Sequence, residues 1–272
     1  RPADLAPLSV GVPSGEITVT RPTRPIELNP AQILNARFGP VTLSGTDELP
    51  GEVWVGNDLP LTYYWKVVAA PQEDLTARVT LMGETTSVVQ DFAPVRPDYP
   101  TTQWQPAESL RAPTDFHIPA DLPSGDYLLS LVMVGAQGPL ADPVTLGRVH
   151  VIAPERSFTL PAMPHALSAK FGNVAELIGW GLEGGELTLY WRALATADES
   201  YTVFVHLRDA AGALVSQHDA PPMNGARPTT SWLAREIISD THRLAVPAGP
   251  FTIQIGLYDQ ASGRRLMLEG GG

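Results

Sequence analysis

The stretch LTYYWKVV, at Leu61–Val68, decides the fold class of this chain. Its large apolar residues fall on alternate positions from Leu61 to Val67, so they share one face of an extended segment. Thr62, Tyr64 and Lys66 take the opposite face. Such a period of two predicts a half-buried β-strand. A near copy, LTLYWR, stands at Leu187–Arg192 and predicts a second strand of the same kind.

Four further blocks recur in the same order around these two strands, which indicates an internal repeat. The pairs are ARFG at 36–39 with AKFG at 169–172, LTARVTL at 75–81 with YTVFVHL at 201–207, TTQW at 101–104 with TTSW at 229–232, and PSGDYLLSLVMVG at 123–135 with PAGPFTIQIGLYD at 247–259. The repeat predicts two homologous domains, residues 26–153 and 154–272, with a hinge near Ile152–Ser157.

The Pro and Gly residues between the apolar segments favour an all-β fold. The chain holds 27 Pro and 24 Gly, and no window of helical length carries a 3.6-residue apolar stripe. Short strands at close spacing are typical of sandwiches, so we expect two tandem immunoglobulin/fibronectin-like β-sandwiches. Residues 1–25 hold five prolines and predict an extended N-terminal arm, with one edge strand at Glu16–Thr20.

Composition excludes several classes of function. With no Cys, the chain has no disulfide, thiolate nucleophile or cysteine-ligated metal. A net charge of −11 disfavours nucleic acid and anionic membranes as partners. No apolar run is long enough to span a bilayer. The chain begins at Arg1 rather than Met, so we expect a processed or excised piece of a longer protein, and a signal peptide or membrane anchor upstream stays open.

The repeated aromatic residues receive separate interpretations. Trp65 and Trp191 lie on the apolar face of their strands and predict core positions between two sheets. Trp104 and Trp232 stand in weakly periodic segments, where they are either loop anchors or exposed platforms on which a sugar ring stacks. Two Pro-x-Gly-x-aromatic turns are assigned structural roles only, with the residues Gly125, Tyr127, Gly249 and Phe251.

Polar residues of the second repeat are the remaining candidates for chemistry. They are His206, His218, His242, Asp209, Asp219, Asp240 and Asp259, and their spacing matches no metal motif. We therefore expect scattered, individually satisfied side chains, with no metal, cofactor or catalytic residue assigned. A Ca²⁺ ion at acidic loops stays open as an alternative. Nucleophile elbows, phosphate loops and dinucleotide fingerprints are missing from the sequence.

The second repeat resembles a known domain type. The residues that carry the resemblance are LTLYWRA at 187–193, YTVFVHLRDAAGALVSQHDAPP at 201–222, RPTTSW at 227–232 and FTIQIGLYDQASGRRL at 251–266. They are similar to β-sandwich domains of Chloroflexi-type cell-surface proteins and of the extracytoplasmic tails of glycosyltransferase-like membrane proteins. The first repeat departs from the pattern, because it lacks the FVHL strand and the GLYD ending. The resemblance implies an extracytoplasmic accessory or structural role and no catalytic residues.

Three functions follow as hypotheses. The first is a non-catalytic structural or interaction protein of the cell surface, which binds proteins or copies of itself through residues 1–25. The second is a carbohydrate-binding module that uses Trp104 and Trp232. The third is a glycan-active enzyme, whose paired carboxylates a sequence alone cannot reveal.

Overall fold

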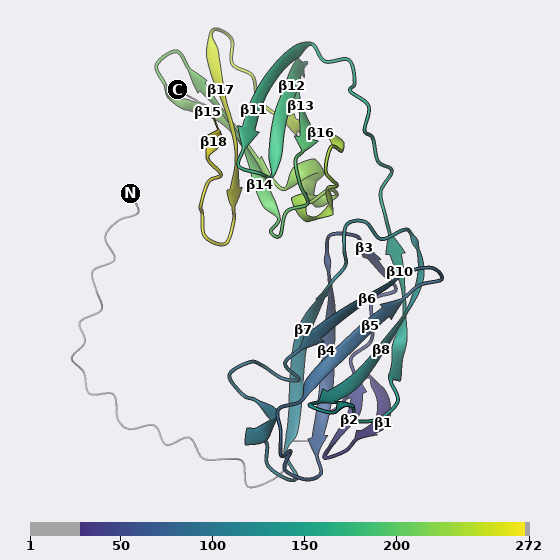
Figure 1. The fold of residues 1–272 in the computed structure, drawn as a ribbon. Coiled ribbons are helices and arrows are strands. Elements are labelled where there is room, and N and C mark those ends of the chain that lie inside the picture. The colour runs from purple at the N-terminus through teal and green to yellow at the C-terminus, as the bar shows by residue number, and fades with distance from the viewer. Residues whose placement is uncertain (1–27, 270–272) are drawn as a thin grey trace, which may run out of the picture.

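The computed structural model describes residues 28–269, and this part of the chain is all-β (Figure 1). The predicted arm, residues 1–25, lies outside the described residues. The first half contains β1 (Gln32–Phe38), β2 (Val41–Thr46), β3 (Glu52–Trp54), β4 (Asp58–Val67), β5 (Thr76–Met82), β6 (Ser87–Phe92), β7 (Ser109–His117), β8 (Gly125–Gly135), β9 (Gly138–Pro139) and β10 (Val144–Ile152).

The second half repeats this arrangement with fewer strands. It contains β11 (His165–Phe171), β12 (Ala175–Glu183), β13 (Glu186–Ala193), β14 (Tyr201–Asp209), β15 (Leu214–Ala220), β16 (Ile237–Arg243), β17 (Phe251–Asp259) and β18 (Leu268–Glu269). Three short 3₁₀ turns complete the described residues: η1 (Thr101–Gln103), η2 (Pro222–Gly225) and η3 (Thr229–Ser231). Residues 28–269 hold no helix with the length and apolarity of a membrane span.

Four sheets form two separate sandwiches. In the first, the sheet β1-β2-β4-β7 faces the sheet β3-β10-β8-β5-β6, with β9 on β8. In the second, β16-β13-β12-β11-β18 faces β15-β14-β17. Every strand pair lies within residues 32–152 or within residues 165–269, and each half has its own apolar core. The predicted hinge near Ile152–Ser157 falls in the interval between them.

The deciding strand forms as predicted. All of it except Val68 lies in β4, and its alternating residues Leu61, Tyr63 and Trp65 are buried against the opposite sheet. Tyr64 of the other face is buried as well, and its hydroxyl donates to Asp47 at 2.7 Å. Trp65 and Trp191 are fully buried in the two cores, which confirms their structural interpretation. Their indole nitrogens differ. The Trp65 Nε1–H donates to the carbonyl of Pro94 at 2.9 Å, whereas the Trp191 Nε1 has no partner among residues 28–269.

The two Pro-x-Gly-x-aromatic turns are also present, with one difference in burial. Gly125 and Gly249 have φ values of +158° and +125°, which favour glycine. Tyr127 then enters the first core fully, but Phe251 is only half-buried at the edge of the second. Phe251 is therefore a peripheral core residue.

The different hydrogen bonding of the two indole nitrogens gives a prediction that compares the same substitution at both tryptophans. Trp65→Phe leaves the buried Pro94 carbonyl without a donor, whereas Trp191→Phe removes a donor that is already unpaired. Both changes lose the same ring volume. We expect Trp65→Phe to cost about 1 kcal/mol more free energy of unfolding than Trp191→Phe. Urea unfolding followed by far-UV circular dichroism measures the difference, and an equal or larger cost for Trp191→Phe would contradict it.

Candidate functional site

The two loop tryptophans proposed as sugar platforms are buried. Trp104 and Trp232 each have 0% of their surface exposed. The Trp104 ring lies 6.5 Å from that of Trp65, between centroids, and the Trp232 Nε1–H donates to the carbonyl of Arg227 at 2.9 Å. A stacking platform needs a free ring face, so the ligand-stacking interpretation of both residues is wrong. They are loop anchors, and the carbohydrate-binding hypothesis loses the residues on which it rested.

The loops that carry these tryptophans fold by one repeated hydrogen-bond pattern. Thr101 accepts a bond from the backbone N–H of Leu75 at 2.8 Å and donates to the carbonyl of Glu73 at 3.1 Å. Thr229 repeats the arrangement with Tyr201 at 2.9 Å and Glu199 at 2.8 Å. Each threonine thus satisfies backbone groups that burial of the neighbouring tryptophan removes from water.

A glutamate closes each of these loops. Glu236 accepts from the backbone N–H of Leu233 at 2.9 Å, and Glu108 accepts from that of Gln105 at 2.9 Å. In the first sandwich the Tyr99 hydroxyl also donates to Glu108 at 3.0 Å. In the second sandwich Arg227 takes the corresponding place, with its Nη2 2.6 Å from Glu236 Oε1. The second loop therefore holds an ion pair at a position where the first holds a phenol.

Glu236 is the centre of a buried electrostatic cluster in the second sandwich. Its side chain is 0% exposed, and a second guanidinium, that of Arg156, reaches it at 2.6 Å. A buried carboxylate is tolerated only when it is paired and hydrogen-bonded, and Glu236 has two cations and one backbone donor. Two cations on one anion leave the cluster with a net positive charge.

Arg156 connects this cluster to the first sandwich. It lies in the linker between β10 and β11 (Figure 1), and its Nη1 also donates to the carbonyl of Ser231 at 3.0 Å. Its Nη2 donates to the carbonyl of Ala120, which follows β7 in the first sandwich. One side chain of the linker is thus bonded to both halves, so we take this junction as the candidate functional site.

A glycine permits the halves to approach. Gly56, between β3 and β4, has φ +79°, a left-handed conformation. A Cβ atom built at Gly56 would lie 2.5 Å from the Cα of Ser231, closer than real Cβ contacts. Any side chain here would push η3 away from the first sandwich. Sequence reasoning missed Gly56, Arg156 and Glu236, although the spacing Trp-x-x-x-Glu in both repeats was a signal for Glu236.

Histidines that the sequence leaves scattered come together at one edge of the second sandwich. The Nδ1 atoms of His218 on β15 and His242 on β16 are 2.8 Å apart, and His242 Nε2 lies 2.9 Å from Asp240 Oδ2. Asp240 also accepts from the backbone N–H of Met223 at 2.7 Å. The expectation of individually satisfied residues is wrong for these three. They form a hydrogen-bonded chain that joins the edges of the two sheets.

The other acidic candidates serve local structure. His206 pairs with Asp219 at 3.3 Å, and Asp209 accepts from the backbone N–H groups of a hairpin turn. Hydrogen bonds from the Ser262 hydroxyl and the Ala261 N–H lower the pKa of the Asp259 carboxyl. Within residues 28–269 no three histidine or acidic side chains converge as metal ligands.

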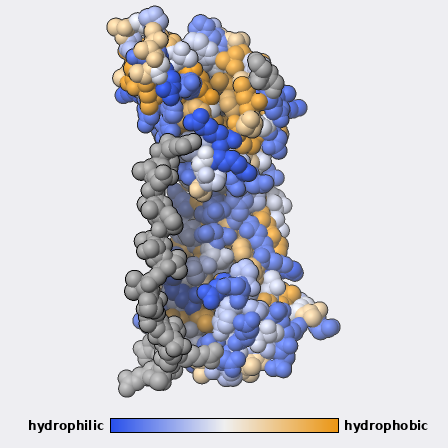
Figure 2. All heavy atoms as spheres, turned by 90° about the vertical axis from the view of Figure 1, so that its left-hand side faces the viewer, coloured by the Kyte–Doolittle hydropathy of each residue, from blue (hydrophilic) through white to orange (hydrophobic). Residues whose placement is uncertain are grey.

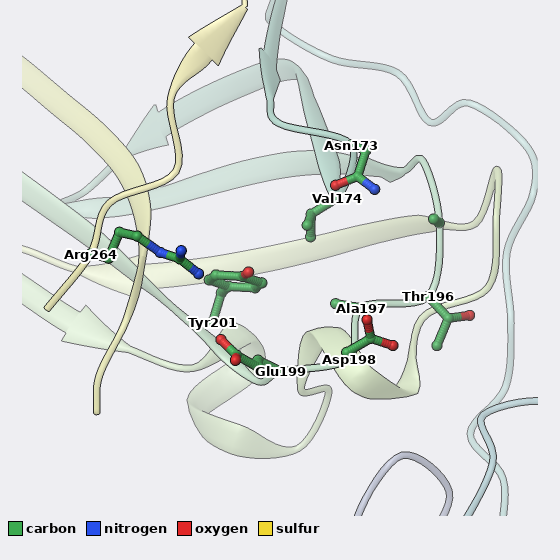
Figure 3. A pocket seen from close by; sticks show the side chains of 9 residues that line it. Asn173, Val174, Thr196, Ala197, Asp198, Glu199, Tyr201 and Arg264 are labelled. Carbon is green, nitrogen blue, oxygen red and sulfur yellow. The ribbon is translucent and has the colours of Figure 1, made fainter. Parts of the chain in front are cut away.

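One polar cavity, of about 230 Å³, opens at an end of the second sandwich (Figure 3). Arg264 points toward the ring of Tyr201, with Glu199 beneath it. Asn173, Thr196 and Asp198 complete the polar lining. These groups can hold a small polar ligand, but the lining contains no imidazole beside a hydroxyl, the pair that nucleophilic catalysis uses.

Comparison with known proteins adds little to this geometry. No known protein family matches the sequence, and no curated protein matches it. Among solved structures, a protein described as membrane-anchored, from Corynebacterium diphtheriae, is similar at 11% identity and TM-score 0.25, over 80% of this chain and 55% of that one. A structure of native α2-macroglobulin from Escherichia coli that spans domains NIE-MG1 is similar at 13% identity and TM-score 0.18, over 79% of this chain and 95% of that one. This chain thus spans about half of the first protein, and likenesses so weak carry no functional argument.

The buried cluster at the junction gives the next prediction. Glu236→Gln removes the charge between Arg156 and Arg227, and we expect it to cost about 3 kcal/mol of unfolding free energy. The control is Glu186→Gln, which faces Arg243 at the same 2.6 Å distance but on an exposed surface, where the pair contributes less than about 1 kcal/mol. Urea denaturation of both variants measures this. Equal costs for the two changes would show that burial at the junction is unimportant.

Proposed function

We propose that this chain is a non-catalytic structural module of a cell-surface assembly. Its two sandwiches act as a spacer of fixed geometry, and residues 1–25 join it to other protein, including further copies of itself. The proposed location is extracytoplasmic, supported by the resemblance of the second repeat to domains of cell-surface and membrane-bound proteins.

The observation that carries this proposal is the junction. Linkers between independent domains normally leave them free to move. Here Arg156 is bonded to Ala120 of the first sandwich and to Ser231 and Glu236 of the second. Gly56 lets the backbones come into direct contact beside it. Two sandwiches held in this way keep a constant distance and orientation between their far ends, which is what a spacer requires.

The use of polar groups supports the non-catalytic part of the proposal. The buried threonines and glutamates of the tryptophan loops satisfy backbone atoms, and the aspartates of the hairpins cap turns. Asp240 and His242 join two sheet edges. These side chains make hydrogen bonds that stabilise the fold, and the cores between the facing sheets are made of apolar residues.

A distance measurement tests the spacer. The chain lacks Cys, so spin labels can be placed at Glu84→Cys in the first sandwich and Gln217→Cys in the second, both exposed. Pulsed electron paramagnetic resonance should give one narrow distance distribution. Adding Arg156→Gln should broaden it, because the bonds to Ala120 and Glu236 are lost. The surface change Arg243→Gln is the control and should leave the width unchanged. A broad distribution without Arg156→Gln would overturn the fixed junction.

The assembly part has its own test. Deleting residues 1–25 should convert an oligomer into a monomer of the remaining chain, because the arm supplies the contact between copies. Size-exclusion chromatography with light scattering measures the mass of both forms. A mass per particle that is unchanged by the deletion, or an intact chain that is already monomeric, would contradict the proposal.

A further inference from the structure

The outer edge of β17 is incompletely paired. One side of β17 is bonded along its length to β14. On the other side the chain turns back only briefly, with Leu266 N–H donating to the Leu257 carbonyl at 2.8 Å and a bridge from Arg265 to Tyr258. It then crosses to the opposite sheet, where β18 pairs with β11. Within residues 28–269, nothing pairs with the outer edge of Phe251–Gly256.

The first sandwich has the same edge, and there it is covered. The strand β8 is the counterpart of β17, since both follow a Pro-x-Gly turn. The return is also alike, because Leu140 N–H donates to the Met133 carbonyl at 2.9 Å. The first sandwich then continues along the edge as β10, which pairs antiparallel with β8 from Val144 opposite Leu131 to Val151 opposite Gly125.

The inward side chains of β8 and β17 differ in how deeply they are buried. The inward residues of β8, Tyr127, Leu129 and Leu131, are buried, and β10 contributes Leu146, Val149 and Val151 to the same core. The corresponding residues of β17 are only half-buried, namely Phe251, Ile253 and Ile255. The second core is thus short of one strand of apolar side chains. A strand edge of this kind is a template for pairing with another chain.

The surrounding surface is apolar as well. Figure 2 shows apolar residues on the second sandwich, on the side where β15, β17 and β18 lie in Figure 1. Met267 and Leu268, in the segment that follows β17, have exposed apolar side chains, and Leu214 and Val215 are exposed on β15 at the opposite edge of the sheet. The open edge therefore has exposed apolar side chains in the segment that follows it, as in surfaces that contact protein.

We propose that the free edge of β17 accepts an antiparallel strand from a second copy, and that Glu16–Thr20 (EITVT) is that strand. The identification rests on the proposed function, in which the arm joins copies. In β10 the sequence Arg148–Ile152 (RVHVI) buries Val149 and Val151 and exposes Arg148 and His150. Ile17 and Val19 have the same spacing, with polar Glu16, Thr18 and Thr20 around them. Main-chain bonds would provide affinity and the two apolar residues would fill the core.

Cysteine cross-linking tests the site directly, because the full chain has no other Cys. In the register of β10, where Arg148 is opposite Leu128, Glu16 would lie opposite Thr252. Glu16→Cys combined with Thr252→Cys, or with Gln254→Cys for a register two residues away, should give a disulfide-linked species of twice the mass. The control combines Glu16→Cys with Gln217→Cys on β15, the opposite edge of the same sheet, and should not cross-link.

Substitutions in the arm provide a second measurement. Ile17→Lys with Val19→Lys should weaken association at least about tenfold, because two apolar side chains are lost from the joined core. Thr18→Lys, on the outward face, is the control and should leave association unchanged. Light scattering over a dilution series measures both. Equal effects from the inward and outward changes would overturn strand addition.

The outcomes separate the two proposals. If deletion of residues 1–25 leaves the mass unchanged, the arm does not assemble copies and the proposed function fails. If the deletion dissociates the oligomer but the Thr252→Cys and Gln254→Cys variants link no better than the β15 control, only the β17 site is overturned. If the disulfide forms within one chain and the mass is not doubled, the strand that pairs with β17 does not come from a second copy.

Discussion

Burial of a loop tryptophan in each core is the constraint on which much of this structure depends. Without disulfides, each sandwich is held by packing between its sheets, and Trp104 and Trp232 fill space that the strands leave at the core. Burying them draws in the loop backbone, whose polar groups then need Thr229 and Glu236 or their counterparts. Once Glu236 is buried it needs cations, and one of these, Arg156, is in the linker. The contacts of Arg156 at the junction thus follow from the packing of the second core.

Sequence reasoning reached the parts of the fold that depend on local pattern. Alternation identified the β4 strand and the core position of Trp65, and the repeat placed the hinge near the linker. The candidate site was out of reach because its bonds join residues far apart in the chain, such as Arg156 and Glu236. For Trp104 the sequence left a loop anchor and an exposed platform as alternatives, because a loop has no periodicity from which burial can be read, and the structure selects the anchor.

The two repeats share one fold but differ in the contacts made at equivalent positions. Tyr99 and Arg227 occupy equivalent places beside a loop glutamate, but only the arginine version becomes part of a cluster that reaches the linker. Likewise β8 is covered by β10, whereas the chain after β17 crosses to β11. Within residues 28–269, this edge is paired in the first sandwich and is unpaired along Phe251–Gly256 in the second. The two copies have thus diverged both at the loop glutamate and at this edge.

The histidine contact at the edge of the second sandwich fixes the positions of individual protons. With Asp240 as a carboxylate, His242 must donate from Nε2, so in its neutral form its Nδ1 carries a lone pair. When His218 is neutral as well, it donates from Nδ1 across the 2.8 Å gap, and its Nε2 is an acceptor. The two neutral rings are then in opposite tautomers. The tautomer of the inner ring thus determines that of the outer ring on the facing sheet.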